Sequence, residues 1–141
     1  LKQFINAFGE EVMVDNTDKA IAAAAKTTGL VVKDYTAAPI YFGDQNQGAH
    51  EWLIEFENMP ENLSAFTIAL DQNLKLVNSD YEAKRYKDIA LGLPKVTALP
   101  EGLFHAWLKN KGKLGGQHKV PRLSNDRRYI DELLLLLQQY A

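Results

Sequence analysis

The sequence contains no cysteine and no long uninterrupted hydrophobic segment. Without cysteine the chain has no disulfide bond, no thiolate zinc site and no cysteine nucleophile. The longest leucine run, residues 133–137, has five residues, whereas a membrane-spanning helix needs about 20 apolar residues. No basic segment followed by an apolar stretch indicates a secretory signal. We therefore expect a cytoplasmic protein that does not enter a membrane.

Histidine is also scarce, and its placement argues against a metal centre. The three histidines, His50, His105 and His118, have no short spacing of the kind that brings metal ligands together. No serine lies in the glycine pattern of a nucleophile elbow, so a hydrolytic triad is not expected either. The sequence therefore predicts no metal site.

The chain has the size and composition of one globular domain. Of its 141 residues, 46% are hydrophobic and 24% are charged, so we expect residues 1–141 to form a single domain around a buried core.

The net charge of −2 hides an asymmetry, because residues 109–128 contain seven basic residues and one acidic residue. The rest of the chain carries a net charge of −8. A basic cluster on an acidic domain indicates one surface that faces an anion.

Hydrophobic periodicity predicts helices mixed with short strands. Strands are expected at residues 4–8, 30–42, 50–57 and 95–99, and helices at residues 15–28, 60–77, 79–91, 102–111 and from 124 towards the C-terminus. This order is typical of an α+β domain with a small mixed, largely antiparallel sheet flanked by helices. It resembles a βαββαβ plan with added helices.

The strand expected at residues 50–57 alternates between apolar and acidic side chains. Apolar residues face one side and carboxylates the other: Trp52, Ile54 and Phe56 against Glu51, Glu55 and Glu57. This alternation predicts an antiparallel strand with one face in solvent. In the strand before it, Pro39 cannot donate to a ladder, which favours an edge position or a bulge.

The expected helix starts carry recognisable capping signals. Asp15 and Ser124 are candidate N-caps, and Pro60 suits the first turn of a helix. Ser79 and Glu82 have the spacing of a capping box.

The strongest candidate for chemistry is the segment 112–122, which reads Gly-Lys-Leu-Gly-Gly-Gln-His-Lys-Val-Pro-Arg. Its three glycines favour a mobile or tightly turning backbone. Lys113, Lys119 and Arg122 supply positive charge for a phosphate or a carboxylate. The segment lacks the spacing and the Lys-Ser or Lys-Thr pair of a phosphate-binding P-loop. Composition alone leaves two interpretations open, an anion site and a solvated basic loop.

A second polar cluster comprises Asn78, Tyr81, Lys84 and Arg85. Tyr81 shares a helix face with both Lys84 and Arg85, which follow it by three and four residues. Such a face could bind an anion. Helix capping and an amphipathic surface explain the same spacing more simply.

Together these elements resemble the C-terminal part of the auxin-responsive promoter family, the acyl-acid amido synthetases. The resemblance rests on residues 78–85, 100–104 and 116–122, which follow the order and spacing of the family. The Gln-x-Lys-x-Pro-Arg element in the last segment is the most specific. Plant members carry Tyr-Lys-Thr-Pro-Arg where this chain has His-Lys-Val-Pro-Arg, which is more similar to the bacterial branch.

The resemblance implies an adenylate-forming ligase. In such enzymes a large N-terminal domain holds ATP and the acyl acid, and a small C-terminal domain closes on it as a lid. This chain would be that lid, beginning after the hinge, and its start at Leu1 agrees with this. A carboxylic acid would be adenylated, and its acyl group would pass to an amine, typically that of an amino acid. The N-terminal domain would be the lid's partner and would bind most of the ATP and Mg²⁺.

The resemblance also implies roles for individual residues. Lys119 matches the lysine that relatives insert into the adenylation site, where it would stabilise the α-phosphate and acyl oxygens. The residues that would position this loop or contact the nucleotide are Gln117, His118 and Arg122. Weaker candidates for the nucleotide side or the domain interface are Tyr81, Lys84 and Arg85.

Two other functions fit the same sequence. A non-catalytic module could bind an anionic partner, RNA or a nucleotide, through residues 109–128, although the main hypothesis involves no nucleic acid. An interaction domain could instead use the last helix, which the leucine run 133–137 makes apolar nearly all round. Such a helix is either enclosed within the domain or covers another surface.

Overall fold

The computed structural model describes residues 3–43, 47–112 and 119–140. Its elements follow in the order β1 (Phe4–Ile5), β2 (Val12–Met13), α1 (Val14–Thr28), β3 (Val32–Tyr41), β4 (Gly48–Phe56), α2 (Leu63–Val77), α3 (Ser79–Arg85), the 3-10 helix η1 (Tyr86–Asp88), β5 (Lys95–Leu99), α4 (Leu103–Asn110) and α5 (Arg128–Gln139). Helices and short strands thus alternate irregularly along the chain. This confirms the predicted α+β class.

Three strands form the main sheet in the order β3–β4–β5. Strands β3 and β4 are antiparallel, whereas β4 and β5 are parallel. The first strand does not join this sheet, because β1 pairs with β2 in a separate antiparallel hairpin. The main sheet is therefore mixed, as predicted, but it lacks the first strand of the βαββαβ plan.

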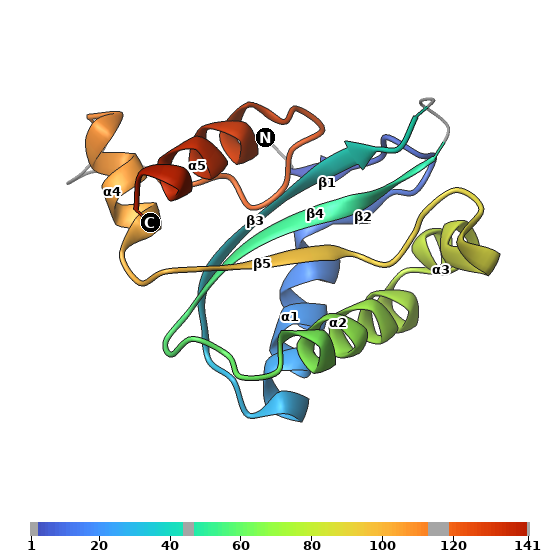
Figure 1. Ribbon diagram of the computed structural model, residues 1–141. Coiled ribbons are helices and arrows are strands. Elements are labelled where there is room, and N and C mark those ends of the chain that lie inside the picture. The colour runs from blue at the N-terminus through green and yellow to red at the C-terminus, as the bar shows by residue number, and fades with distance from the viewer. Residues whose placement is uncertain (1–2, 44–46, 113–118, 141) are drawn as a thin grey trace.

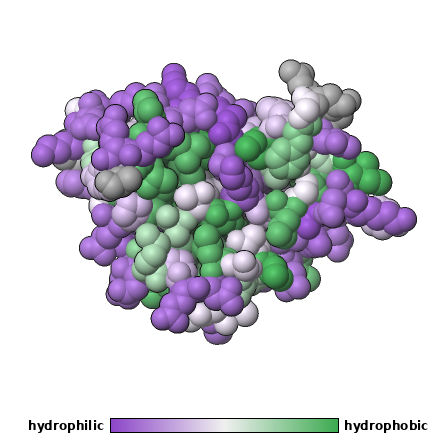
Figure 2. Space-filling model, in the orientation of Figure 1, coloured by the Kyte–Doolittle hydropathy of each residue, from purple (hydrophilic) through white to green (hydrophobic). Residues whose placement is uncertain are grey.

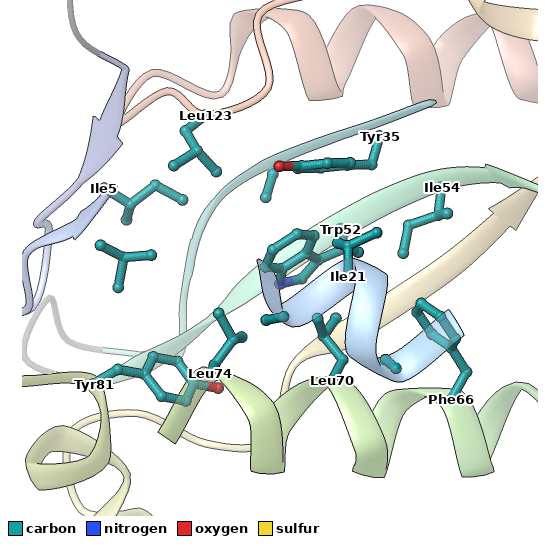
Figure 3. Close-up of a cluster of buried hydrophobic side chains, with 14 of the residues drawn as sticks. Ile5, Ile21, Tyr35, Trp52, Ile54, Phe66, Leu70, Leu74, Tyr81 and Leu123 are labelled. Atoms are coloured by element: carbon teal, nitrogen blue, oxygen red, sulfur yellow. The ribbon is translucent and has the colours of Figure 1, made fainter. Parts of the chain in front are cut away.

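Helices cover both faces of the main sheet, with α4 and α5 above it and α1 and α2 below it in Figure 1. Beneath the sheet, Trp52 and Ile54 of β4 pack in one core cluster with Phe66 and Leu70 of α2 (Figure 3). On the other face, Leu53 belongs to a second cluster with side chains of α4 and α5. Every residue of β4 is therefore buried.

The prediction of a solvent-exposed face on β4 is wrong. Glu51 and Glu55 are only 1% and 5% exposed, because α4 and α5 lie over that face. A buried carboxylate needs partners, and Glu55 accepts hydrogen bonds from the backbone N–H groups of Gly102 (3.0 Å) and Phe104 (3.3 Å) at the start of α4. Glu57, just after the strand, is exposed as predicted.

Two helices start close to the predicted capping residues but use different ones. In α1 the Asn16 side chain accepts a hydrogen bond from the Met13 N–H (3.0 Å). Asp15 instead lies within the first turn, where its charge suits the helix dipole. Helix α3 is capped by the Asn78 side chain, one residue before the predicted Ser79. Asparagine caps as well as serine, so the sequence alone does not decide between these neighbours.

Pro60 and Ser124 precede their helices without starting them. Asn62 caps α2 by accepting a hydrogen bond from the Ala65 N–H (3.0 Å). Ser124 donates its backbone N–H to the carbonyl of Ala37 in β3 (3.1 Å). The residue predicted to cap the last helix is thus part of the edge of the sheet, and α5 begins only at Arg128.

Strand β3 is an edge strand of the main sheet, as the proline predicts. Pro39 pairs with His50 in regular register, and the irregularity in the ladder lies between Val32 and Asp34. The edge position is therefore confirmed, and the alternative of a bulge at the proline is not needed.

The last helix packs one face into the domain and leaves the other on the surface. Ile130 and Leu133 are buried in the second core cluster, whereas Leu135 is 60% exposed. Only one face of this helix is enclosed, so the alternative in which it covers another surface stays a prediction. In the described ranges no helix is both long and apolar enough to span a bilayer.

Apolar side chains also reach the surface beside β5, where Figure 2 shows green patches among polar residues. Ile68 and Leu93 are about half exposed. They line a groove of about 360 Å³ together with Val96 of β5. The groove lies between α2 and the start of β5, which pairs with β4 alone among the described strands.

The buried position of Glu55 can be tested against its exposed neighbour. Changing Glu55 to alanine leaves two N–H groups at the start of α4 without their acceptor, so we expect the free energy of unfolding to fall by about 2–4 kcal/mol. Glu57→Ala is the matched control and should change it by less than about 0.5 kcal/mol. Chemical denaturation of the two variants measures both values. Equal effects would contradict the burial of this face.

Candidate functional site

The segment 119–125 is fixed along the outer edge of β3. The Ala37 N–H donates to the Arg122 carbonyl (2.8 Å), and the Thr36 hydroxyl donates to the Pro121 carbonyl (2.7 Å). Ala37 and Leu123 form a parallel bridge. The segment thus extends the sheet at its edge, and Lys119 lies where this attachment begins.

Arg122 is held by a carboxylate of α1. Its Nη1 atom lies 2.9 and 3.0 Å from the two carboxylate oxygens of Asp18. Its guanidinium also lies over the ring of Tyr35, 5.4 Å from the centroid. Burial and a hydrogen bond to Asp18 raise the pKa of Tyr35, so this phenol stays protonated at neutral pH. Arg122 therefore anchors the segment to β3 and α1.

A hollow of about 780 Å³ lies beside this segment. Its walls come from the residue before β1, the end of β2, the start of α1, β3 and the segment itself. The lining residues are Gln3, Met13, Val14, Asp15, Asn16, Asp34, Lys119, Val120 and Arg122. Burial raises the pKa of Asp34 in this wall. The exposed Lys119 can present its ammonium group to an anion at the rim.

Two predicted site residues, Gln117 and His118, lie outside the described residues. Both immediately precede Lys119 in the sequence. Their predicted contacts with a nucleotide stay a prediction.

Tyr81 and Arg85 meet in a different place, between α2 and α3. Arg85 makes two hydrogen bonds to Asp71, from Nε (2.7 Å) and from Nη2 (2.8 Å). The Tyr81 hydroxyl donates to the same carboxylate (2.7 Å). Arg85 also pairs with Asp88. Both predicted residues are buried, and the geometry favours the interpretation that they hold two helices together.

The pKa values of this cluster follow from its burial and its hydrogen bonds. Burial raises the pKa of Asp71, but hydrogen bonds from Arg85 and Tyr81 outweigh it and hold that pKa below the ordinary value of 3.8. Burial and the neighbouring Asp71 raise the pKa of Tyr81. The cluster therefore contains one ionised carboxylate, one neutral phenol and one guanidinium at neutral pH.

Lys84, on the same helix, lies over the turn between β1 and β2. Its Nζ would be 3.1 Å from a Cβ atom added at Gly9. Gly9 has a φ of +87°, a conformation that suits glycine. Lys84 thus covers the turn of the hairpin and does not line the hollow that contains Lys119.

Several charges of the basic segment 109–128 are paired within the domain. Lys111 lies 2.8 Å from Glu132, and Arg127 lies 2.9 Å from Glu51. With Arg122 bound to Asp18, three of the basic residues are partly neutralised. These three charges are therefore less available to an anionic partner such as RNA.

No motif in the sequence identifies the acidic and amide partners of these residues. Asp18 is 104 positions from Arg122, and Asp71 is 14 positions from Arg85. Neither pair has the spacing of neighbouring helix positions. Gln3 and Asp34, which line the hollow, likewise belong to no motif.

Asp71 should make stability depend on acid pH. Its folded-state pKa is below the ordinary value of 3.8, so its contribution is complete above that value and is lost as the pH falls through the folded-state pKa. We expect Asp71→Asn to cost about 3 kcal/mol at pH 7 and to show a shallower loss of stability below about pH 4 than the unmodified chain. Urea denaturation across this pH range, with the exposed Asp80→Asn as control, measures the difference. Identical acid profiles would contradict the pairing.

Two solved structures with this fold are described as acyl acid amido synthetases. A structure described as "GH3.15 acyl acid amido synthetase" matches with a TM-score of 0.74 and 17% identity, over 98% of this chain and 24% of that one. A second, "AtGH3.15 acyl acid amido synthetase in complex with 2,4-DB", has a TM-score of 0.74 and 16% identity, over 98% of this chain and 25% of that one. The chain thus spans about a quarter of the length of these proteins.

A search of curated proteins finds no match. The family model described as "GH3 family C-terminal domain" matches residues 15–128, which include the main sheet, Lys119 and Arg122. This match covers well over half of the sequence, and the resemblance seen in the motifs is confirmed. The chain therefore belongs to the GH3 family and corresponds to its C-terminal domain.

Proposed function

We propose that this chain is the lid domain of a cytoplasmic, ATP-dependent acyl-acid amido synthetase. Membership of the GH3 family supports a ligase in full length. The similar structures carry the name acyl acid amido synthetase, and this chain spans about a quarter of each. The proposal assigns the acyl-acid pocket, ATP and its Mg²⁺ mainly to an N-terminal domain, which would be the partner of this chain.

The observation that carries the proposal is the position of Lys119. This lysine is exposed and lines the hollow beside β3. The residues that follow it are fixed to the sheet by hydrogen bonds from Thr36 and Ala37. A cation on a well-anchored segment suits a lid that must bring positive charge to a site on another domain.

The proposed reaction has two steps. In the first, a carboxylate oxygen of the acid attacks the α-phosphorus of ATP, and the bond to the bridging oxygen breaks to release pyrophosphate. In the second, an amine attacks the acyl carbon, the bond to AMP breaks, and the amine loses a proton. Lys119 would stabilise the negative charge on the α-phosphate and acyl oxygens. The closed site would exclude water from around these oxygens.

The other predicted residues take different roles in this proposal. Arg122 would hold the segment through Asp18 and leave contact with the substrate to its neighbours. Gln117 and His118 would contact the nucleotide or position the loop. Tyr81 and Arg85 would act only through the packing of α2 and α3, since both are already bound to Asp71.

Replacing Lys119 with alanine in the full-length enzyme should slow adenylation by about 100-fold or more, because one preorganised charge is removed from the transition state. The melting temperature should stay nearly unchanged, since the Lys119 side chain is exposed. The rate of pyrophosphate release in the presence of the carboxylic acid substrate measures adenylation, and thermal denaturation measures the melting temperature.

Lys26→Ala provides the matched control. Lys26 is an exposed lysine in the last turn of α1, so its removal should leave pyrophosphate release at the normal rate. If Lys119→Ala also releases pyrophosphate at the normal rate, the proposed role of Lys119 is wrong.

The isolated 141-residue chain should have no ligase activity and should bind ATP weakly at most. One lysine on an open hollow supplies too few phosphate contacts for tight binding. Isothermal titration calorimetry with ATP and Mg²⁺ measures this affinity. Binding in the low micromolar range would contradict the lid assignment.

A further inference from the structure

The segment that follows Lys119 is also held by the opposite end of the chain. The side-chain oxygen of Gln3 accepts hydrogen bonds from two successive backbone N–H groups, those of Arg122 (2.8 Å) and Leu123 (3.3 Å). Gln3 lines the same hollow as Lys119. One side chain thus fixes two consecutive peptide groups shortly after the proposed catalytic lysine.

A second pair of contacts joins the same two stretches of chain. The Asn6 N–H donates to the Asn125 side chain, and the Asn125 amide donates back to the Asn6 side chain, each at 3.0 Å. Between these polar contacts, Ile5 and Leu123 are buried in one core cluster, and Figure 3 shows them at the same end of it. The N-terminal strand therefore aligns with the segment through both polar and apolar contacts.

The β1–β2 hairpin, which directly follows Gln3, is itself fixed to the central strand β4. Glu10, in the connection between β1 and β2, is fully buried, and one of its oxygens lies 2.6 Å from Nε2 of His50 in β4. Its other oxygen accepts the Phe8 N–H (2.8 Å). The hairpin next to Gln3 is therefore anchored to the core. The hydrogen bonds of Gln3 in turn hold the Lys119 segment in a defined position relative to this hairpin.

Gln3 itself contributes little to the core. Its side chain is exposed, and an exposed hydrogen bond competes with water. The rate of reaction is more sensitive than stability to the position of Lys119, because a displacement of about 1 Å in a reacting group can lower the rate about 100-fold. The two hydrogen bonds are thus better suited to setting the place of the segment than to stabilising the fold.

We propose that Gln3 is a positioning residue for Lys119. The proposal rests on the proposed function, in which Lys119 acts on the α-phosphate. Gln3 acts through the Arg122 and Leu123 backbone and does not contact the substrate.

The test uses the full-length enzyme with Gln3→Met, which keeps the length of the side chain and removes the acceptor oxygen. For pyrophosphate release that requires the carboxylic acid substrate, we expect kcat to be about tenfold lower than in the unmodified enzyme. The KM values for ATP and for the carboxylic acid should stay unchanged. Gln3→Glu retains an oxygen at the same reach and should restore most of the rate. Gln138→Met, the same change at an exposed glutamine of α5, serves as the control.

The same change in a Lys119→Ala background separates positioning from a general structural role. If Gln3 acts through Lys119, then Gln3→Met should cause no further loss once Lys119 is absent. An equal loss in both backgrounds overturns the proposal, and so does a normal rate for Gln3→Met alone. A normal rate for Lys119→Ala would instead refute the proposed role of Lys119 in the reaction.

Amide hydrogen exchange provides a readout that does not depend on activity. The Arg122 and Leu123 amides should exchange about tenfold faster in Gln3→Met than in the unmodified enzyme and in Gln3→Glu. Peptides from β4 should keep their protection, which shows that the domain is folded. Unchanged exchange at residues 122 and 123 overturns the proposal.

Discussion

The burial of β4 on both faces is the constraint on which the rest of the structure depends. A central strand between two helical layers brings its acidic side chains into the interior, where each requires a partner. Glu55 meets this need by accepting the backbone N–H groups at the start of α4. Glu51 binds Arg127 (2.9 Å), the residue just before α5. Arg127 also donates to the carbonyl of Pro39 (2.9 Å). The carboxylates of one strand thus fix where the two upper helices begin.

The same requirement determines which basic residues remain available for a ligand. Arg85 neutralises the buried Asp71 between α2 and α3, and Arg122 is engaged by Asp18 on α1. Lys111 joins α4 to α5 through Glu132. These ion pairs stabilise the packing of specific elements. Lys119, by contrast, is exposed at the rim of the hollow, which is why the proposed chemistry centres on this residue.

The sequence predicts the elements of this fold better than their surroundings. Strand β5 and the apolar stripe of α2 follow from local periodicity, because each depends on residues close in the sequence. The burial of Glu51 and Glu55 could not be predicted, since it depends on α4 and α5, which begin about 50 and about 75 residues later in the chain. In the candidate site, the motif identifies Lys119. It does not reveal Gln3 or Asp18, which lie more than 100 residues away from the segment they hold.

The contacts of the Lys119 segment also bear on how a lid would deliver this residue. The segment is attached to β3, to α1 and to the N-terminal strand, by hydrogen bonds that span 85 to 120 positions in the sequence. Attachments to three elements leave little freedom for residues 120–125 to move separately from the sheet. Under the proposed function, Lys119 would therefore reach the α-phosphate by rotation of the whole domain, as in hinged closure. Rearrangement of this segment alone would break contacts that anchor it to the core, among them the burial of Leu123.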